Sequence, residues 1–199
     1  MQVKRPTAVI CGRTVLYEGF LRVYRYDFDV EAHEGGVRRV SREVMERGHA
    51  VAVLGHDPDR DEVVLANEFR PGALVAGEYP YRDNLVAGMI DEGEDAVTAA
   101  VREMHEETGL ELSDPVLIHP GAFVSSGGTS EKIALVYGVV DTSTAGGVHG
   151  SAAEGEDILS VVLPAGEFIE RVHSGRINDF KTLVAGYWFA ERRERARRD

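Results

Sequence analysis

Three glutamates, Glu103, Glu106 and Glu107, have the spacing in this sequence that most directly suggests chemistry. Residues three and four apart lie on one face of a helix, so these carboxylates would share one arc. Carboxylates placed so closely repel one another, and near a helix C-terminus the helix dipole adds to the repulsion. A hard divalent cation such as Mg²⁺, which prefers oxygen ligands, would neutralise the cluster. The spacing therefore favours a metal site over a purely solvated acidic face.

The helix that must position these glutamates is predicted from about Glu94 to Thr108. Its apolar stripe, at helical spacing, comprises Val97, Ala100, Val101, Met104 and Thr108. Gly109 follows directly and suits a left-handed C-cap. Arg102 lies four residues before Glu106 and is expected to orient the carboxylates from behind the metal ligands.

The charge of the chain is concentrated in the same segment. The whole sequence has 34 acidic and 22 basic residues, a formal net charge of −12. Residues 88–112 contain eight carboxylates and one arginine, which gives −7 and exceeds half of that excess. An acidic chain repels the phosphates of nucleic acid over most of its surface, so a nucleic-acid partner is not expected.

Composition narrows the class of protein further. Apolar residues make up 43 % and charged residues 28 %, as in a globular protein with a core. No run approaches the ~20 apolar residues of a membrane span, and the N-terminus lacks a signal-peptide pattern. The single cysteine, Cys11, excludes an internal disulfide and a cysteine-based zinc site. These features predict a cytoplasmic protein without a membrane partner.

The remaining elements indicate an α+β fold. Two further helices are predicted, at about 165–174 and from Asp179 through the tail. Glu34-Gly35-Gly36 is typical of a hairpin turn, and residues 143–156, rich in Gly, Ser and Ala, suggest a mobile surface loop. Strands are predicted at 13–18, 21–30, 37–45, 50–54, 62–69, 116–123, 133–140 and 158–163.

The acidic segment resembles the Nudix family. Gly88, then five residues, Glu94, then seven residues, and Arg102-Glu103 begin its sequence box. Met104, one further residue, Glu106-Glu107, one residue, and Gly109-Leu110 complete it. Seven fixed identities and two apolar positions make this match far more specific than a lone glycine loop. The resemblance implies a hydrolase that cleaves nucleoside diphosphates linked to another moiety, with Mg²⁺ or Mn²⁺ bound by a loop–helix–loop.

The resemblance extends from about Arg42 to Leu183 and is similar to the ADP-ribose pyrophosphatase branch. The segments that carry it are 47–54, 68–70, 86–88, 127–131 and 175–182. It implies mixed β-sheets sandwiched between helices, in a Nudix domain over residues 48–199. Residues 1–47 resemble the small antiparallel β-sheet domain through which that branch forms a domain-swapped homodimer. The implied substrate is ADP-ribose, split into AMP and ribose 5-phosphate.

The resemblance also implies roles for single residues. Glu103 and Glu107 would bind metal directly, Glu106 would bind it directly or through water, and the backbone carbonyl of Ala87 would complete the site. Glu94 would hold the loop of the box by hydrogen bonding. The water-activating base is expected to be Glu131, on a loop that Gly127 and Gly128 make flexible, with Glu106 as the next choice. The substrate-binding set comprises Arg70, Arg42 and Gly128.

Two departures from that branch affect the expected substrate. Asn84 stands where the branch commonly has glutamate, and Ser126 where it commonly has proline. These changes leave hydrolysis in place but leave another nucleoside diphosphate sugar, such as GDP-mannose, as an alternative substrate. A non-catalytic ADP-ribose-binding module is the alternative from a different class; it would be expected to have lost box carboxylates, and this sequence keeps them all.

Overall fold

The computed structural model describes residues 5–151 and 155–198, and its chain divides into two compact units. One unit comprises Met1–Gly48 and Phe123–Lys132, and the other comprises His49–Ala122 and Ile133–Asp199. The division expected from the sequence, at residue 47, leaves residues 123–132 with the second part. Contacts group them with the N-terminal strands instead, because Met45 N donates to Gly128 O (2.9 Å) and Ser130 N to Met45 O (3.2 Å).

The N-terminal unit is a three-stranded antiparallel sheet, as predicted. Strands β1 (Ala8–Glu18), β2 (Arg22–Glu31) and β3 (Val37–Glu46) follow one another in that order, joined by tight turns. The β2–β3 turn contains Gly35 and Gly36, both with positive φ, as the Glu34-Gly35-Gly36 pattern predicts. Large apolar side chains remain exposed on this sheet, among them Ile10, Phe20 and Val37.

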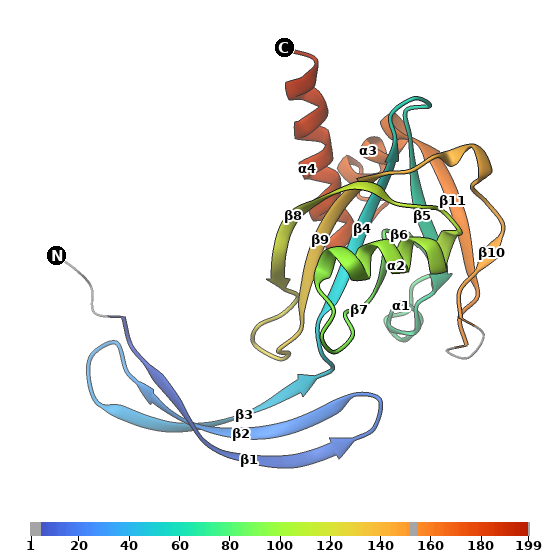
Figure 1. The fold of residues 1–199 in the computed structure, drawn as a ribbon. Coiled ribbons are helices and arrows are strands. Elements are labelled where there is room, and N and C mark those ends of the chain that lie inside the picture. The colour runs from blue at the N-terminus through green and yellow to red at the C-terminus, as the bar shows by residue number, and fades with distance from the viewer. Residues whose placement is uncertain (1–4, 152–154, 199) are drawn as a thin grey trace. The chain divides into compact units, whose positions relative to one another are not determined.

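The second unit is built on an eight-stranded mixed sheet (Figure 1). Its path is β10-β11-β5-β4-β9-β8, with β6 paired to β5 and β7 to β4. Strand β4 is parallel to β9 and antiparallel to β5 and β7. The strands are β4 (Ala50–Asp57), β5 (Glu62–Phe69), β6 (Tyr81–Asn84), β7 (Val86–Met89), β8 (Ser113–Phe123), β9 (Lys132–Val139), β10 (Val148–His149) and β11 (Ile158–Pro164).

Helices cover both faces of this sheet, which confirms the predicted α+β sandwich (Figure 1). Strand β4 shows why, because it is buried throughout and its side chains alternate between two cores. Val51 and Val53 pack toward the long helix α2, whereas Ala52 and Leu54 pack toward the two later helices. The helices are α1 (Pro71–Val75), α2 (Ala96–Thr108), α3 (Ala165–His173) and α4 (Phe180–Ala196). No helix of the described residues is long and apolar enough to cross a membrane.

Composition predicts a mobile surface loop over residues 143–156, and the described part of this segment contains short regular elements. Thr142–Thr144 forms a 3₁₀ helix, and β10 pairs with β11 through Val148–Leu159 and His149–Ile158. Positive φ at Gly146, Gly147 and Gly150 allows the chain to turn tightly around this short strand. Glycine here therefore serves defined turns in the described part of the segment, 143–151 and 155–156.

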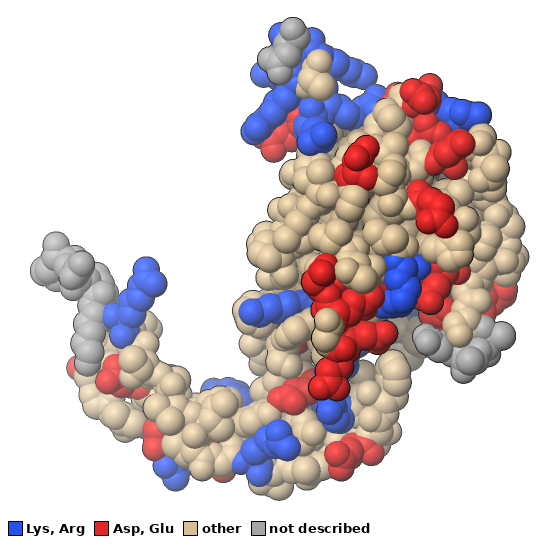
Figure 2. All heavy atoms as spheres, in the orientation of Figure 1, with Lys and Arg blue, Asp and Glu red and all other residues tan. Residues whose placement is uncertain are grey.

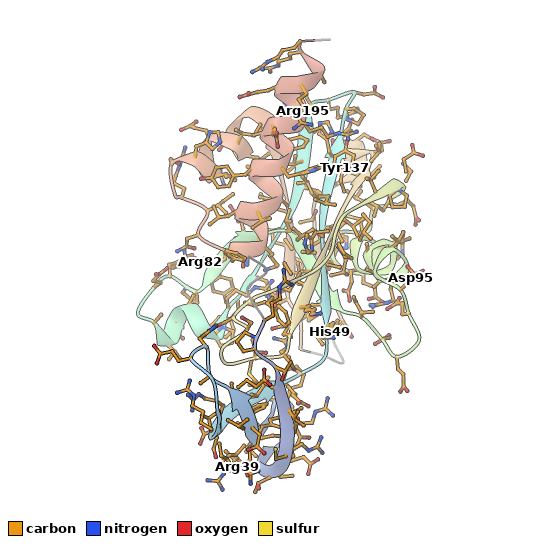
Figure 3. The ribbon with its side chains drawn as sticks, turned by 90° about the vertical axis from the view of Figure 1, so that its left-hand side faces the viewer. Arg39, His49, Arg82, Asp95, Tyr137 and Arg195 are labelled. Atoms are coloured by element: carbon orange, nitrogen blue, oxygen red, sulfur yellow. The ribbon has the colours of Figure 1, made fainter. Side chains whose placement is uncertain are left out.

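A buried histidine ties the sheet to α4. His56, at the end of β4, is 8 % exposed, and its Nδ1 lies 3.0 Å from the hydroxyl of Tyr137. Its ring meets the edge of Phe189 of α4, with 4.9 Å between ring centroids. Tyr137, labelled in Figure 3, projects from β9 and packs against the same helix through Trp188 and Phe189. Burial lowers the pKa of His56 below 6.5, and Asp61 partly opposes that shift.

This histidine is expected to make folding pH-dependent. Because the folded pKa lies below 6.5, the unfolded chain binds more protons than the folded chain just below that pH. The contribution of His56 is therefore fully present above about pH 7 and declines as pH falls through 6.5 toward the lowered value. We expect the free energy of unfolding of the wild type, measured in urea relative to His56→Gln, to fall between pH 7.5 and 5.5. Parallel pH profiles for the two proteins would contradict this assignment.

Candidate metal and phosphate site

The site is built on α2, whose two ends are capped by local sequence. The side chain of Asp95, labelled in Figure 3, accepts from Val97 N and Thr98 N at 2.9 Å each, so the helix begins at Ala96, two residues later than predicted. At the other end Gly109 is left-handed (φ 71°) and donates to His105 O (2.8 Å), as its sequence position predicts. These caps fix the helical positions of the glutamates.

Arg102 joins the start of the box to its carboxylates. Its guanidinium donates to both oxygens of Glu94 (3.2 and 3.0 Å) and to the carbonyl of Met89 (2.9 Å). It also donates to Glu103 (2.8 Å) and Glu106 (3.0 Å). Glu94 in turn accepts from Asp91 N (3.1 Å), which closes the loop before the helix. Glu94 therefore belongs to the hydrogen-bonded loop before the helix, and Arg102 connects it to Glu103 and Glu106.

The three glutamates on the arc have different environments. Glu103 is 8 % and Glu107 2 % exposed, whereas the side chain of Glu106 is 51 % exposed. Burial raises the pKa of Glu103, and burial together with the charge of Glu103 raises the pKa of Glu107 to about 8. Glu107 also accepts from the backbone N–H of Ala87 (3.2 Å). Figure 2 shows acidic side chains gathered around α2, with basic ones beside them.

Gly88 gives Glu103 its position. A Cβ on Gly88 would lie 1.8 Å from Oε1 of Glu103, so the carboxylate lies against backbone that only glycine leaves open. Strand β7, which carries Gly88, pairs with the first half of β4 (Val51 opposite Gly88). Glycine at the first position of the box therefore has a steric reason in this fold: it lets a buried carboxylate approach the strand.

Two carboxylates missing from the sequence-based set face the same cluster. The charge of Glu156 raises the pKa of Glu103 and of Glu68, and the charge of Glu68 raises that of Glu107. Glu156 lies just before β11 and Glu68 near the end of β5, far from the box in sequence. Because they lie far from the box in sequence, no spacing pattern predicts their approach to it. The one available signal is that Glu68 stands in a segment that resembles the ADP-ribose branch.

Arg70, predicted to bind substrate, lies beside this cluster. Its guanidinium forms an ion pair with Glu68 (2.9 Å), and its charge lowers the pKa of Glu107. Asn84 is buried next to it, and with the amide oxygen turned toward Arg70 it accepts from Nε at 3.2 Å. The departure from the branch at position 84 therefore lies in direct contact with the arginine expected to bind substrate.

The segment 175–182 contacts the chain just before β7, the strand that carries Ala87 and Gly88. Asp179 accepts from Thr182 N (3.0 Å) and caps α4. The buried hydroxyl of Thr182 accepts from Leu85 N (3.0 Å), in the joint between β6 and β7 just before Ala87. This segment, which resembles the branch, therefore holds the start of β7, the strand whose Ala87 contacts Glu107.

Glu131, Gly128 and Arg42 belong to the N-terminal unit, whereas the box and Arg70 belong to the other. Glu131 is buried, and one of its oxygens lies 3.6 Å from Nε of Arg47. The carbonyl of Gly128 accepts from Met45 of β3. Arg42, also on β3, is exposed and donates to the carbonyl of Ser41 (2.7 Å). Each unit therefore holds its own subset of the expected residues.

The donors of the acidic cluster fit a hard divalent cation. Among the described residues, no group of three or more His, Cys, Asp or Glu side chains is already arranged as a metal-binding set, and Arg102 holds Glu103 and Glu106. Yet Glu103 and Glu107 are buried carboxylates with raised pKa values, and bringing a cation to them would offset the desolvation of their charged forms. Oxygen-only donors in this setting suit Mg²⁺ or Mn²⁺.

The fold is a mixed sheet with helices on both faces. On it, a loop followed by the capped helix α2 carries a cluster of carboxylates suited to a divalent metal ion. The chain belongs to the Nudix family: the NUDIX domain matches residues 46–176. This family membership confirms the resemblance carried by the box.

Three known proteins show what the chain is similar to. It is 40 % identical over 182 residues to the ADP-ribose pyrophosphatase of Escherichia coli K12, covering 90 % of this chain and 86 % of that protein. It is 30 % identical to the GDP-mannose pyrophosphatase of Cronobacter sakazakii, covering 85 % and 88 %. A crystal structure described as an ADP compounds hydrolase shares the fold, with a TM-score of 0.70 at 21 % identity over 96 % and 95 % of the two chains.

Proposed function

We propose that this protein is a metal-dependent hydrolase that cleaves the diphosphate of ADP-ribose to AMP and ribose 5-phosphate. The observation that carries the proposal is a pair of buried carboxylates at β7, Glu103 against Gly88 and Glu107 on the N–H of Ala87, in a chain that keeps every box carboxylate. The 40 % identity to an ADP-ribose pyrophosphatase supports ADP-ribose as the substrate. Mg²⁺ is the proposed metal, and Mn²⁺ is expected to substitute for it.

A bound divalent ion would neutralise phosphate charge and lower the pKa of a bound water. Glu103 and Glu107 would hold it, together with the carbonyl of Ala87, and Glu106 would contribute directly or through water. Arg102 keeps the acids oriented, since it already holds Glu94, Glu103 and Glu106. Glu68 and Glu156 add negative charge to the same cluster. Arg70 would bind a substrate phosphate through its planar fork, with Arg42 and Gly128 as further substrate contacts.

The main alternative is another nucleoside diphosphate sugar, such as GDP-mannose. The relative with that activity is less similar, at 30 % identity. Asn84 beside Arg70 is the feature that favours a changed substrate, because a neutral amide holds the guanidinium less strongly than a carboxylate would. The non-catalytic binding module is disfavoured, because the box carboxylates are all present in the sequence.

A hydrolysis panel tests the proposal directly. The purified protein is incubated with Mg²⁺ and, separately, ADP-ribose, GDP-mannose, NADH and a dinucleoside polyphosphate, and kcat/KM is measured for each. We expect the largest value for ADP-ribose, with AMP and ribose 5-phosphate as products. A larger value for another compound would reject the substrate and leave the reaction class. Inactivity on all four, with ADP-ribose bound, would favour the binding module.

Glu131 is the proposed water-activating base, and its replacement gives a specific prediction. Glu131→Gln is expected to lower kcat by about 10²-fold or more, with a smaller change in KM, because general-base catalysis commonly contributes that much. Glu156→Gln serves as the comparison, since this carboxylate lies in the metal cluster and its loss should weaken metal binding first. Steady-state kinetics over a Mg²⁺ series separates the two effects. An unchanged kcat in Glu131→Gln would remove Glu131 from the mechanism.

We further propose a domain-swapped homodimer formed through the N-terminal sheet, in the cytoplasm. Exposed apolar side chains on β1–β3 support it, because isolated three-stranded sheets rarely leave such surface uncovered. The single cysteine fits a reducing compartment. Sedimentation equilibrium of the full chain tests the dimer; a mass equal to one chain at micromolar concentration would reject it.

A further inference from the structure

A glycine-rich clip, defined here as residues 146–151, is fastened to the C-terminal end of α2. Gly150 N donates to the carbonyl of Glu106 (3.2 Å), an acceptor in the last turn of the helix. Ser160 N of β11 donates to Gly147 O (3.1 Å), and β10 within the clip pairs with β11. The clip is therefore held on one side by the metal-site helix and on the other by the sheet.

His149 is the side chain that fits the clip to the helix. Its Nε2 donates to the carbonyl of Gly146 (2.8 Å), which fixes the plane of the ring. Its Cε1 would lie 2.9 Å from a Cβ on Gly109, so the imidazole packs into space that the box glycine leaves open. Gly109 thus has two reasons to be glycine, its left-handed backbone and the ring that rests against it.

The same clip contacts Glu156. Ser151 N donates to Oε2 of Glu156 (3.0 Å), and Glu156 N donates to Ser151 O (3.1 Å). A Cβ on Gly150 would lie 2.8 Å from the Cβ of Glu156, so the side chain of Glu156 begins directly against Gly150. The position of the Glu156 carboxylate is therefore determined by residues adjacent in sequence to His149.

We propose that His149 is a positioning residue, which fixes the clip against Gly109 and thereby holds Glu156 in the acidic cluster of the box. The inference rests on the proposed metal-dependent function, and it gives His149 no contact with metal or substrate. Gly150, whose N–H donates to the carbonyl of Glu106, lies against Glu156, which places this residue beside the last turn of α2. The charge of Glu156 also raises the pKa of Glu103 and of Glu68, in agreement with that position. Groups that orient metal-site residues from behind commonly change metal affinity by 10–100-fold.

The test measures Mn²⁺ binding by electron paramagnetic resonance, without substrate, in a double-mutant cycle of His149→Ala and Glu156→Gln. We expect His149→Ala to raise the Kd for Mn²⁺ by about 10-fold in the wild-type background. In the Glu156→Gln background the same change should raise it less than about 2-fold, because the carboxylate that His149 positions is gone. His105→Ala, at an exposed histidine of α2, is the matched control and should bind Mn²⁺ as the wild type does.

Equal effects of His149→Ala in both backgrounds would show general structural damage and overturn the inference, as would an unchanged Kd. If His149→Ala does not fold, His149→Gln is used instead, because glutamine keeps a donor for the carbonyl of Gly146. This variant is expected to raise the Kd for Mn²⁺ by about 3-fold, with the same dependence on Glu156. A wild type that binds no Mn²⁺ and hydrolyses none of the panel would overturn the proposed function together with this inference. A functional wild type with an uncoupled His149 overturns the inference alone.

Discussion

Glu107→Gln is expected to lower hydrolysis by at least about 10²-fold at saturating Mg²⁺ while the protein stays folded. Glu107 is the most deeply buried acid of the box, and its side chain lies beside the backbone of Ala87. Glutamine keeps the size and an acceptor for the Ala87 N–H, but it removes the negative oxygen that a cation needs. Steady-state release of AMP, with Mn²⁺ affinity as a second measurement, checks the result.

The same substitution, Glu107→Gln, is expected to leave the free energy of unfolding unchanged or to raise it. A buried carboxylate whose pKa is raised to about 8 is held at a desolvation cost, and a neutral amide of the same shape avoids that cost. Urea unfolding is therefore expected to give a free energy equal to or above that of the wild type. Glu111→Gln, an exposed acid just beyond the same helix, is the control and should leave both activity and stability unchanged. Near-normal activity in Glu107→Gln would reject the metal assignment.

Gly88→Ala is expected to reduce activity as severely, although it removes no charged group. The new Cβ would occupy the place of the Glu103 carboxylate, 1.8 Å from Oε1. That carboxylate is the far end of a flexible side chain, so it is expected to rotate away rather than force the strand to move. Stability should change by less than about 1 kcal/mol, while Mn²⁺ affinity and hydrolysis both fall by about 10²-fold or more.

Two other glycines separate this effect from packing. Gly55→Ala would place a Cβ 2.8 Å from Val64 and 2.9 Å from Met104, in the packed core, and is expected to cost about 1–3 kcal/mol of stability without weakening Mn²⁺ binding. Gly166→Ala, in α3 with open space around it, should be neutral or slightly stabilising. If Gly88→Ala behaves like Gly55→Ala, Gly88 serves packing and not the position of Glu103.

Local sequence sufficed for the elements that carry the site. The acidic helix, its glycine C-cap, the helix starting after Asp179 and the N-terminal hairpin all follow from patterns within a few residues. The box residues identified the family in the same way, because their spacing within one loop–helix–loop is itself the signal. Sequence patterns do not predict α1 or the short strands β6, β7 and β10, because strands of four or fewer residues carry no periodicity of their own.

The sequence by itself determined which acids share one arc of α2, and the tertiary structure decided which of them are buried. Glu103 and Glu107 are buried against β7 whereas Glu106 faces solvent, since burial depends on a strand that pairs with β4. Likewise, the packing of β5, β10 and β11 beside the helix brings Glu68 and Glu156 to the cluster. The same packing places His149 against Gly109. Helical spacing and capping act between near neighbours, whereas desolvation and charge coupling act between residues that only the packed fold brings together.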